Sequence, residues 1–245
     1  MNSVCIIQAD NRDPETFFLK KTMIVNKRAA ERLNFDYKFI KFENEDGVHP
    51  ATLKIKIINN LIKNNEYEII IFTDSDAWIH DVINLSNIVN IFKNCDKHGC
   101  YSRELPPCNP EKEPHFFGRP PHPSLLNVVT DIHEHNSTYI NSGVFLIKVN
   151  DYIKKMYNYL ENQLINDQRY INWWPWDQYY ISNFVYKNKN DFLILASNIL
   201  NTPWGEVIRH NWLKDDNMYK DLDYLIENKI DINYNGNFKL ENNIE

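Results

Sequence analysis

The stretch EIIIFTDSDAWI, residues 68–79, decides the fold class that this sequence predicts. An apolar run after Glu68 is long enough for a buried strand, and Asp74, Ser75 and Asp76 follow it directly. In open α/β sheets, ligands bind beyond the carboxyl ends of the strands, where side chains converge on one point. Two carboxylates one residue apart suit a hard divalent cation, with Asp76 bound directly and Asp74 through water or substrate. We therefore predict a metal and phosphate site, with a plain turn as the alternative, because Asp and Ser are common turn residues.

Apolar strands alternate with helical periodicity on both sides of this stretch. This alternation predicts an α/β fold in which helices cover a mixed, mostly parallel sheet. The other expected strands are residues 4–9, 37–42, 141–147 and 192–196, and the expected helices are residues 14–33, 50–62, 85–92, 151–165, 177–186 and 222–226. We expect a single domain over residues 1–245, because no Gly/Ser-rich linker or charge block divides the chain.

Two of the expected helices carry specific signals. Asp13 followed by Pro14 is typical of a helix cap with proline at the first helical position. The helix that starts at Pro50 has one apolar face, formed by Leu53, Ile57, Ile58, Leu61 and Ile62. Lys54 and Lys56 are expected to lie off this buried face.

The charge and hydropathy of the chain exclude two classes of partner. The 245 residues carry a formal net charge of −6 with a pI near 5.8, whereas a nucleic-acid-binding protein needs a basic surface. The N-terminal MNSVCIIQAD lacks the basic start and apolar core of a signal peptide, and no run of about eighteen apolar residues encodes a membrane span. We expect a soluble protein without a nucleic-acid partner.

The regular pattern stops in residues 103–138, where seven of the eleven prolines lie between Pro106 and Pro123. A long irregular segment within a domain is usually functional or disordered. We interpret this one as an ordered lid or acceptor-facing loop, or else as a plain surface excursion. The tail, residues 233–245, is expected to fray.

Three cysteines, Cys95, Cys100 and Cys108, lie close together in the sequence with His98 among them. Their C-x4-C-x7-C spacing matches no standard zinc pattern. Reduced cysteines without a metal are therefore the expectation.

Five segments occur in an order that is typical of one enzyme family. They are HPATLKI (49–55), IIIFTDSDAWI (69–79), YINSGVFLIK (139–148), WWPWDQYYISNF (173–184) and VIRHNW (207–212). Together they resemble the GT-A-fold glycosyltransferases, and most of all the retaining galactomannan galactosyltransferase and xyloglucan xylosyltransferase family with its fungal mannosyltransferase relatives. The resemblance covers residues 4–214.

This resemblance implies a reaction and its partners. A hexose or pentose would pass from a nucleotide-sugar to a hydroxyl group of a glycan, glycoprotein or other acceptor, with retention of configuration. A UDP-sugar is the favoured donor, and a GDP-sugar is the alternative because of the mannosyltransferase relatives.

The resemblance also implies a metal and a donor site. Mn2+ or Mg2+ would be held by Asp74, Asp76 and His210, and the nitrogen ligand fits Mn2+ better because it is a softer donor than oxygen. The nucleotide-sugar would be bound by Gln8, Ala9, Asp10, Lys54, Asp74, Ser75 and Lys214. Each could instead be structural, and the family places the last lysine one residue further on, in a glycine-containing segment that this sequence lacks.

A second cluster would form the catalytic and acceptor side. Asp177 and Gln178 match the acidic residue and glutamine that the family has beside the anomeric carbon, where a carboxylate stabilises or attacks an oxocarbenium-like centre. A front-face exchange and a double displacement through Asp177 both remain open, and Asp177 could instead cap the next helix. Asn141, Ser142, Gly143 and Trp176 would lie at the acceptor edge. Trp173, Trp174 and Trp176 could stack on a sugar ring or fill core.

Two other function classes remain open. A phosphatase of the haloacid dehalogenase type also has D-x-D after a strand, but it has Thr or Val where this chain has Trp78. A non-catalytic GT-A-like domain that binds sugar or nucleotide is the other alternative. The eukaryotic family members have an N-terminal membrane anchor, whereas this chain begins close to its first strand, so we expect a bare, cytoplasmic catalytic domain.

Overall fold

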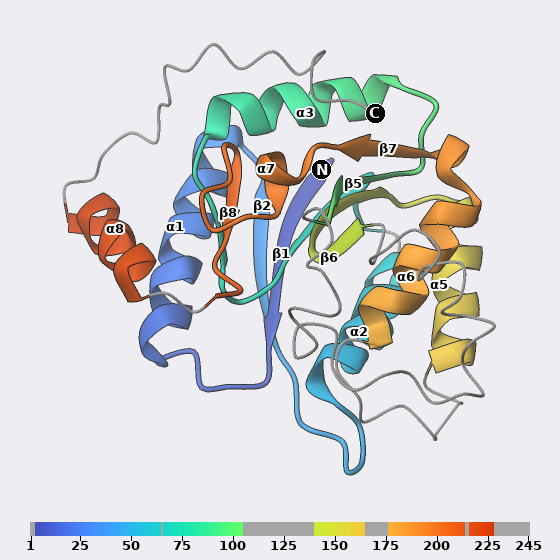
Figure 1. Ribbon diagram of the computed structural model, residues 1–245, viewed down its shortest axis with the longest axis horizontal. Helices are drawn as coiled ribbons and strands as arrows, with labels where there is room; N and C mark the ends of the chain where they lie inside the picture. The colour runs from blue at the N-terminus through green and yellow to red at the C-terminus, as the bar shows by residue number, and fades with distance from the viewer. Residues whose placement is uncertain (1–2, 65, 105–139, 165–175, 214–215, 228–245) are drawn as a thin grey trace, which may run out of the picture.

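A six-stranded mixed sheet forms the centre of the protein (Figure 1). The computed structural model describes residues 3–64, 66–104, 140–164, 176–213 and 216–227. The strands lie in the order β2-β1-β3-β6-β5-β7, and all of them run parallel except β6. Their bounds are β1 Val4–Asp10, β2 Asp36–Lys41, β3 Ile69–Thr73, β5 Gly99–Arg103, β6 Ile140–Lys148 and β7 Phe192–Leu195. The expected α/β fold with a mostly parallel sheet is confirmed.

The reversed strand β6 brings two distant segments of the chain together. It pairs with β3 so that Val144 lies opposite Thr73. The pairing continues beyond the end of β3, where the Asp74 N–H donates to the Gly143 carbonyl oxygen at 2.6 Å. The residues just before Val144 therefore lie beside the residues just after Thr73.

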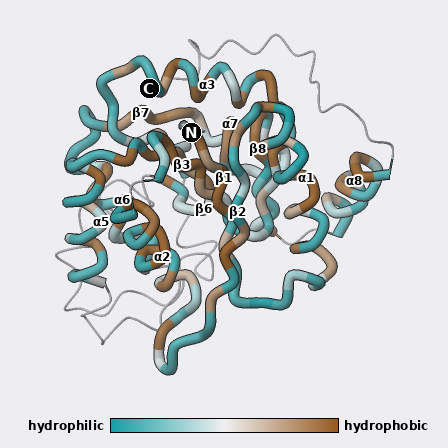
Figure 2. The backbone as a smooth tube through the Cα atoms, turned by 180° about the vertical axis from the view of Figure 1, so that it is seen from behind, coloured by the Kyte–Doolittle hydropathy of each residue, from teal (hydrophilic) through white to brown (hydrophobic). Residues whose placement is uncertain are grey.

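Helices cover both faces of this sheet. One face carries α1 Phe17–Leu33, α3 Val82–Asn94 and the short α7 Ser197–Leu200, and the other carries α2 Pro50–Asn64, α5 Asp151–Leu164 and α6 Trp176–Lys187. Because successive strand residues point to opposite faces, Ile71 packs on the α1 side while Phe72 packs on the α2 side. Figure 2 shows the hydrophobic colour along the central strands. Both faces of the sheet are thus buried.

The last described helix, α8 Asp216–Glu227, lies beside α1 (Figure 1). Its Tyr219 and Leu222 pack with Val25 of α1 and with Trp78. None of the described helices is long and apolar enough to cross a membrane.

A separate two-stranded ribbon lies beside the main sheet. It pairs β4 Ala77–Ile79 with β8 Ile208–His210 in antiparallel fashion, with Ala77 opposite His210. This pairing places His210 beside the segment that follows β3, although 133 residues separate Ala77 from His210. The sequence did not predict β4, β5, β8 or α7, which are three to five residues long and lack the run of four apolar residues that marks the equally short β3 and β7.

The start of α1 was predicted wrongly. The helix begins at Phe17, after Thr16, and not at Pro14. A carboxylate oxygen of Asp13 accepts from the Glu15 N–H at 2.9 Å, so Asp13 forms a turn before the helix instead of capping it. By contrast, Asp81 does cap α3, which therefore starts earlier than the sequence suggested.

Several predictions fall outside the described residues. These are the irregular segment beyond Glu104, Cys108, Trp173, Trp174, Lys214 and the tail. The other three of the four cysteines, Cys5, Cys95 and Cys100, are free in the described structure.

The buried centre of β3 should dominate stability. We expect Ile71→Ala to lower the free energy of unfolding by about 2–5 kcal/mol, because Ile71 is completely buried and the truncation leaves a cavity. Ile83→Ala, at a site that is 52% exposed on α3, should change it by less than about 0.5 kcal/mol. Urea unfolding of both variants measures the difference, and equal losses would contradict this description of the core.

Candidate metal and donor site

A cavity of about 360 Å³ opens where β1 and β3 end and β6 begins. This volume lies within the range of small-molecule sites. Of the residues predicted for the site, the cavity is lined by Ala9, Asp10, Lys54, Asp74, Ser75, Asp76, Asn141, Ser142, Gly143, Asp177, Gln178 and His210. The fold therefore gathers most of the predicted residues from distant segments around one cavity.

The acidic turn, residues 74–76, is held by polar side chains beneath it. The Ser75 carbonyl oxygen accepts from Thr22 Oγ1 at 2.7 Å and from Gln8 Nε2 at 3.2 Å. Gln8 is completely buried, and its Oε1 accepts from the Tyr37 hydroxyl at 2.8 Å. Among the described residues, Gln8 does not line the cavity. Gln8 supports the turn from below. This is the structural role that was the alternative to the predicted contact with the nucleotide-sugar.

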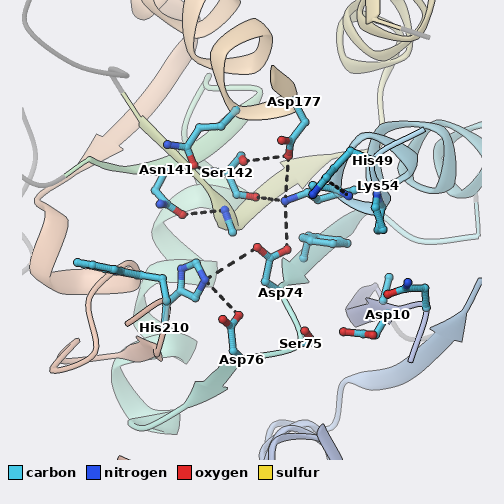
Figure 3. Close-up of a pocket in the computed structure, with 18 of the residues that line it drawn as sticks. Asp10, His49, Lys54, Asp74, Ser75, Asp76, Asn141, Ser142, Asp177 and His210 are labelled. Atoms are coloured by element: carbon cyan, nitrogen blue, oxygen red, sulfur yellow. Dashed lines mark hydrogen bonds and ion pairs between the residues drawn. The ribbon is translucent and has the colours of Figure 1, made fainter. Parts of the chain in front are cut away.

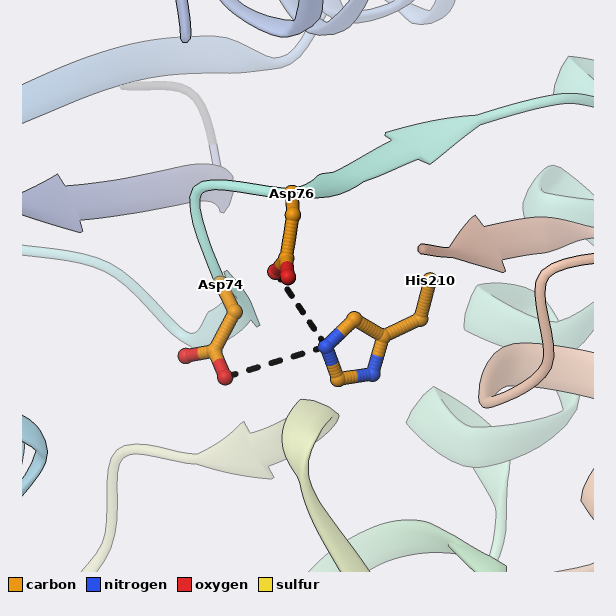
Figure 4. A group of neighbouring side chains, drawn as sticks. All are labelled: Asp74, Asp76 and His210. Carbon is orange, nitrogen blue, oxygen red and sulfur yellow. Dashed lines mark ion pairs between the residues drawn. The ribbon is translucent and has the colours of Figure 1, made fainter. Parts of the chain in front are cut away.

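Three possible metal ligands converge at this turn (Figure 4). Nε2 of His210 lies 3.3 Å from Asp76 Oδ1 and 3.9 Å from Asp74 Oδ2. The ligand atoms all lie within 4.8 Å of one another, and within the described part of the chain this is the one group of that kind. Cys95, His98 and Cys100 form no such group among the described residues.

The donor set fits a divalent cation. Burial disfavours the charged imidazolium, but the Asp76 and Asp74 carboxylates outweigh that effect and raise the pKa of His210. Burial also raises the pKa of Asp74, although Lys54 and His210 counteract it. A positive charge between these groups is thus favoured, and oxygen and imidazole ligands suit Mn2+ or Mg2+.

Gly143 makes room for the imidazole ring. A Cβ atom at this position would lie 2.1 Å from Cε1 of His210, which is far inside van der Waals contact. Gly143 sits within β6, so its backbone cannot move away without breaking the pairing with β3. Here the absence of a side chain is what lets the ring approach the strand.

The prediction that Lys54 lies off the buried face of α2 is wrong. Lys54 is only 6% exposed and extends into the site (Figure 3). Its Nζ lies 3.1 Å from Asp74 Oδ1, 3.2 Å from Asp177 Oδ2 and 3.2 Å from the Ser142 carbonyl oxygen. Burial opposes the ammonium charge, but Asp74 and Asp177 together raise the pKa of Lys54. Three acceptors match its three N–H groups, so its geometry suits cross-linking of the two carboxylates.

Asp177 and Gln178 lie in the first turn of α6. The Asp177 carboxylate is 2% exposed and accepts from Ser142 Oγ at 3.4 Å as well as from Lys54. It is the second residue of α6 and lines the cavity. Oε1 of Gln178 accepts from the Ser142 N–H at 3.3 Å. The Trp176 side chain lies outside the described parts of the structure.

Arg12 and His49 are among the cavity residues that sequence reasoning missed. Arg12 donates from Nε and Nη2 to the two oxygens of Asp10, at 2.8 and 2.6 Å, and from Nη2 to Ser75 Oγ at 2.8 Å. Burial opposes the charge on Asp10, but these bonds lower its pKa. His49 lines the cavity at the start of α2, where its Nδ1 accepts from the Ala51 N–H. Neither residue stands out in the sequence, because charged residues and histidines are common in loops.

No protein-family model and no curated protein matches this sequence. Its fold does resemble solved structures. One is a glycosyltransferase involved in the glycosylation of the major capsid of PBCV-1, which is 12% identical over 90% of this chain and 98% of its own, with a TM-score of 0.62. Another is mouse xyloside xylosyltransferase 1 in its apo form, which is 12% identical over 87% of this chain and 99% of its own, with a TM-score of 0.52. At such low identity these likenesses establish the fold, which is of the GT-A type.

Gly143→Ala should displace His210 from the acidic turn. We expect metal binding to be lost and the free energy of unfolding to fall by about 1–3 kcal/mol, because the new methyl group overlaps the ring. Mn2+ titration and urea unfolding measure the two effects.

The double variant Gly143→Ala/His210→Ala provides the control. Removing the ring relieves the overlap, so stability should recover relative to the single variant while metal binding stays lost. A single variant that binds Mn2+ like the wild type would show that His210 is not a ligand.

Proposed function

We propose that the chain is a metal-dependent glycosyltransferase that moves a hexose or pentose from a nucleotide-sugar to a hydroxyl acceptor. One observation carries this proposal: Asp74, Asp76 and His210 meet at a cavity that Asp177 also lines, with Lys54 Nζ between the Asp74 and Asp177 carboxylates. The GT-A type of fold, which the chain shares with two glycosyltransferases, supports the reaction class. Membership of the galactomannan and xyloglucan transferase family stays a prediction.

The metal end of the cavity would bind the diphosphate of the donor. Asp74, Asp76 and His210 would hold Mn2+ or Mg2+, which when bound neutralises charge that develops on the departing phosphate. Arg12 is the other cation at this end, and Asp10 and Ser75 fix its guanidinium at the cavity wall. The nucleoside would lie along Ala9 and Asp10 at the end of β1. UDP remains the favoured nucleotide and GDP the alternative.

The part of the cavity beside Asp177 would hold the transferred sugar and the acceptor. Lys54 and Ser142 hold the Asp177 carboxylate in a fixed position, facing the cavity. From there it would stabilise positive charge on the anomeric carbon or attack it, so both routes to retention are compatible with the arrangement. The acceptor, a glycan or glycoprotein, would approach along Asn141, Ser142 and Gly143. Because the cavity draws on residues from Ala9 to Trp212, we also propose one catalytic domain.

Calorimetric titration with UDP and GDP, each with Mn2+ and with EDTA, tests the donor site. We expect the wild type to bind at least one nucleotide only with Mn2+, and Asp76→Asn to lose that binding, because a neutral amide is a poor replacement for a buried carboxylate ligand. Asp96→Asn is the control, since the Asp96 side chain is 84% exposed and pairs only with its neighbour Lys97 in the described structure. Metal-independent binding, or none to either nucleotide, would favour the non-catalytic or phosphatase alternatives.

Asp177→Asn separates catalysis from donor binding. The amide keeps the size of the side chain but removes its charge, so we expect unchanged affinity for the nucleotide and at least an about 100-fold loss of turnover. Release of UDP or GDP from a panel of nucleotide-sugars, with and without sugar acceptors, measures turnover. Full activity in this variant would remove Asp177 from the reaction.

A further inference from the structure

Trp212 lines the cavity just after the ribbon strand β8, and its indole ring has a single polar group. That group, the Nε1 N–H, donates to the Asn201 carbonyl oxygen at 2.9 Å. Asn201 is completely buried and, among the described residues, is not part of the cavity wall. Because the indole N–H is the only hydrogen-bonding group of this side chain, Trp212 offers the cavity an apolar ring surface.

The position of the ring in the cavity follows from what holds Asn201. Nδ2 of Asn201 donates to the Arg103 carbonyl oxygen at 3.3 Å and to Glu104 Oε1 at 3.4 Å, so Asn201 is fastened to the end of β5. In the sheet, β5 is the third strand from β1, which at the usual spacing between neighbouring strands is a distance of about 14 Å. The acidic turn follows β3, which lies between them. The anchored edge of Trp212 is therefore far from the end of β1, where the nucleoside is proposed to lie.

Glu104 connects the anchor of Trp212 to the acceptor edge. Its Oε2 accepts from Asn141 Nδ2 at 3.0 Å and from Gln178 Nε2 at 2.8 Å. Both of these amides line the cavity, and Oε1 of Gln178 accepts from the Ser142 N–H at 3.3 Å. The side of the cavity that carries Trp212 is thus the side that carries the acceptor edge.

An apolar ring on this side suits one class of acceptor. The lining groups at the acceptor edge, Asn141, Ser142 and Gln178, are polar, so a ligand that covers them and the indole needs both an apolar face and hydroxyl groups. A pyranose has both, because its axial C–H groups form a face that packs on indole while its hydroxyls point outward from the ring. The hydroxyl of a serine or threonine side chain has no such face beside it.

We propose that Trp212 is a stacking platform for the acceptor, so that the reacting hydroxyl belongs to a sugar ring and not to an amino-acid side chain. This inference rests on the proposed function for the place of the donor. Packing of a sugar on the platform, however, needs neither the metal nor the nucleotide. The two can therefore fail separately.

Saturation-transfer NMR with methyl glycosides of glucose, galactose, mannose and xylose tests the platform in the full chain. Each glycoside is titrated without nucleotide and again with UDP or GDP and Mg2+, which unlike Mn2+ does not broaden the signals. We expect the wild type to bind at least one glycoside, with the strongest saturation at the C–H groups of one ring face.

Trp212→Phe and Trp212→Leu separate stacking from space filling. Both variants lose the bond to Asn201 and keep an apolar side chain, so a purely structural role would be impaired similarly in both. Only Phe keeps an aromatic face. We expect Trp212→Leu to bind the glycoside about 3–10-fold more weakly than Trp212→Phe does, and the two variants to have the same affinity for the nucleotide-sugar.

Trp204→Leu is the control. Trp204 is 57% exposed and, in the described part of the chain, does not line the cavity, so this variant should bind the glycoside like the wild type.

Three results would overturn the proposal. They are a wild type that binds none of the glycosides, equal affinities in the Phe and Leu variants, and a difference between these variants in affinity for the nucleotide-sugar, which would put the transferred sugar on Trp212. If the wild type bound a glycoside but no nucleotide, the proposed function would fail, and the comparison of the two variants would still decide the role of Trp212.

Discussion

The site depends on one constraint: the buried backbone carbonyl oxygens of the acidic turn must accept hydrogen bonds. The turn leaves β3 in a buried place, where a carbonyl oxygen without a hydrogen bond costs about 1–3 kcal/mol. Thr22 and Gln8 donate to the Ser75 carbonyl oxygen, and Asn26 donates to that of Ala77 at 3.0 Å. These three side chains come from β1 and α1, so the first strand and first helix hold the turn in place. Without them the metal ligands would have no fixed position.

Charge balance is the second constraint. Asp74, Asp76 and Asp177 bring three carboxylates to one cavity, and burying carboxylates is costly unless they are paired. Lys54 pairs with two of them, and His210 lies against the Asp74–Asp76 pair. The proposed cation would complete this balance on the metal side. Lys54 thereby lies between the metal side of the cavity and Asp177.

The errors of sequence interpretation have definite physical causes. Helical periodicity assigned Lys54 to the solvent, but a long ammonium side chain can stay buried when three acceptors surround it. The family resemblance implied that Gln8 contacts the nucleotide-sugar, yet its side chain points beneath the turn to Thr22 and Ser75. In both cases a polar side chain serves a buried partner, and local sequence does not reveal such partners.

The sequence by itself determined the α/β class, most of the central strands and the acidic turn, because apolar runs and strand-end residues are local signals. The order of its motifs also pointed to His210 and Asp177, although not to what they touch. Only the tertiary structure decided that β6 runs against its neighbours and that β8 pairs with β4, which brings Gly143 and His210 to the turn. These contacts join residues far apart in the chain. Packing and buried hydrogen bonds select them, and neither leaves a periodic trace in the sequence.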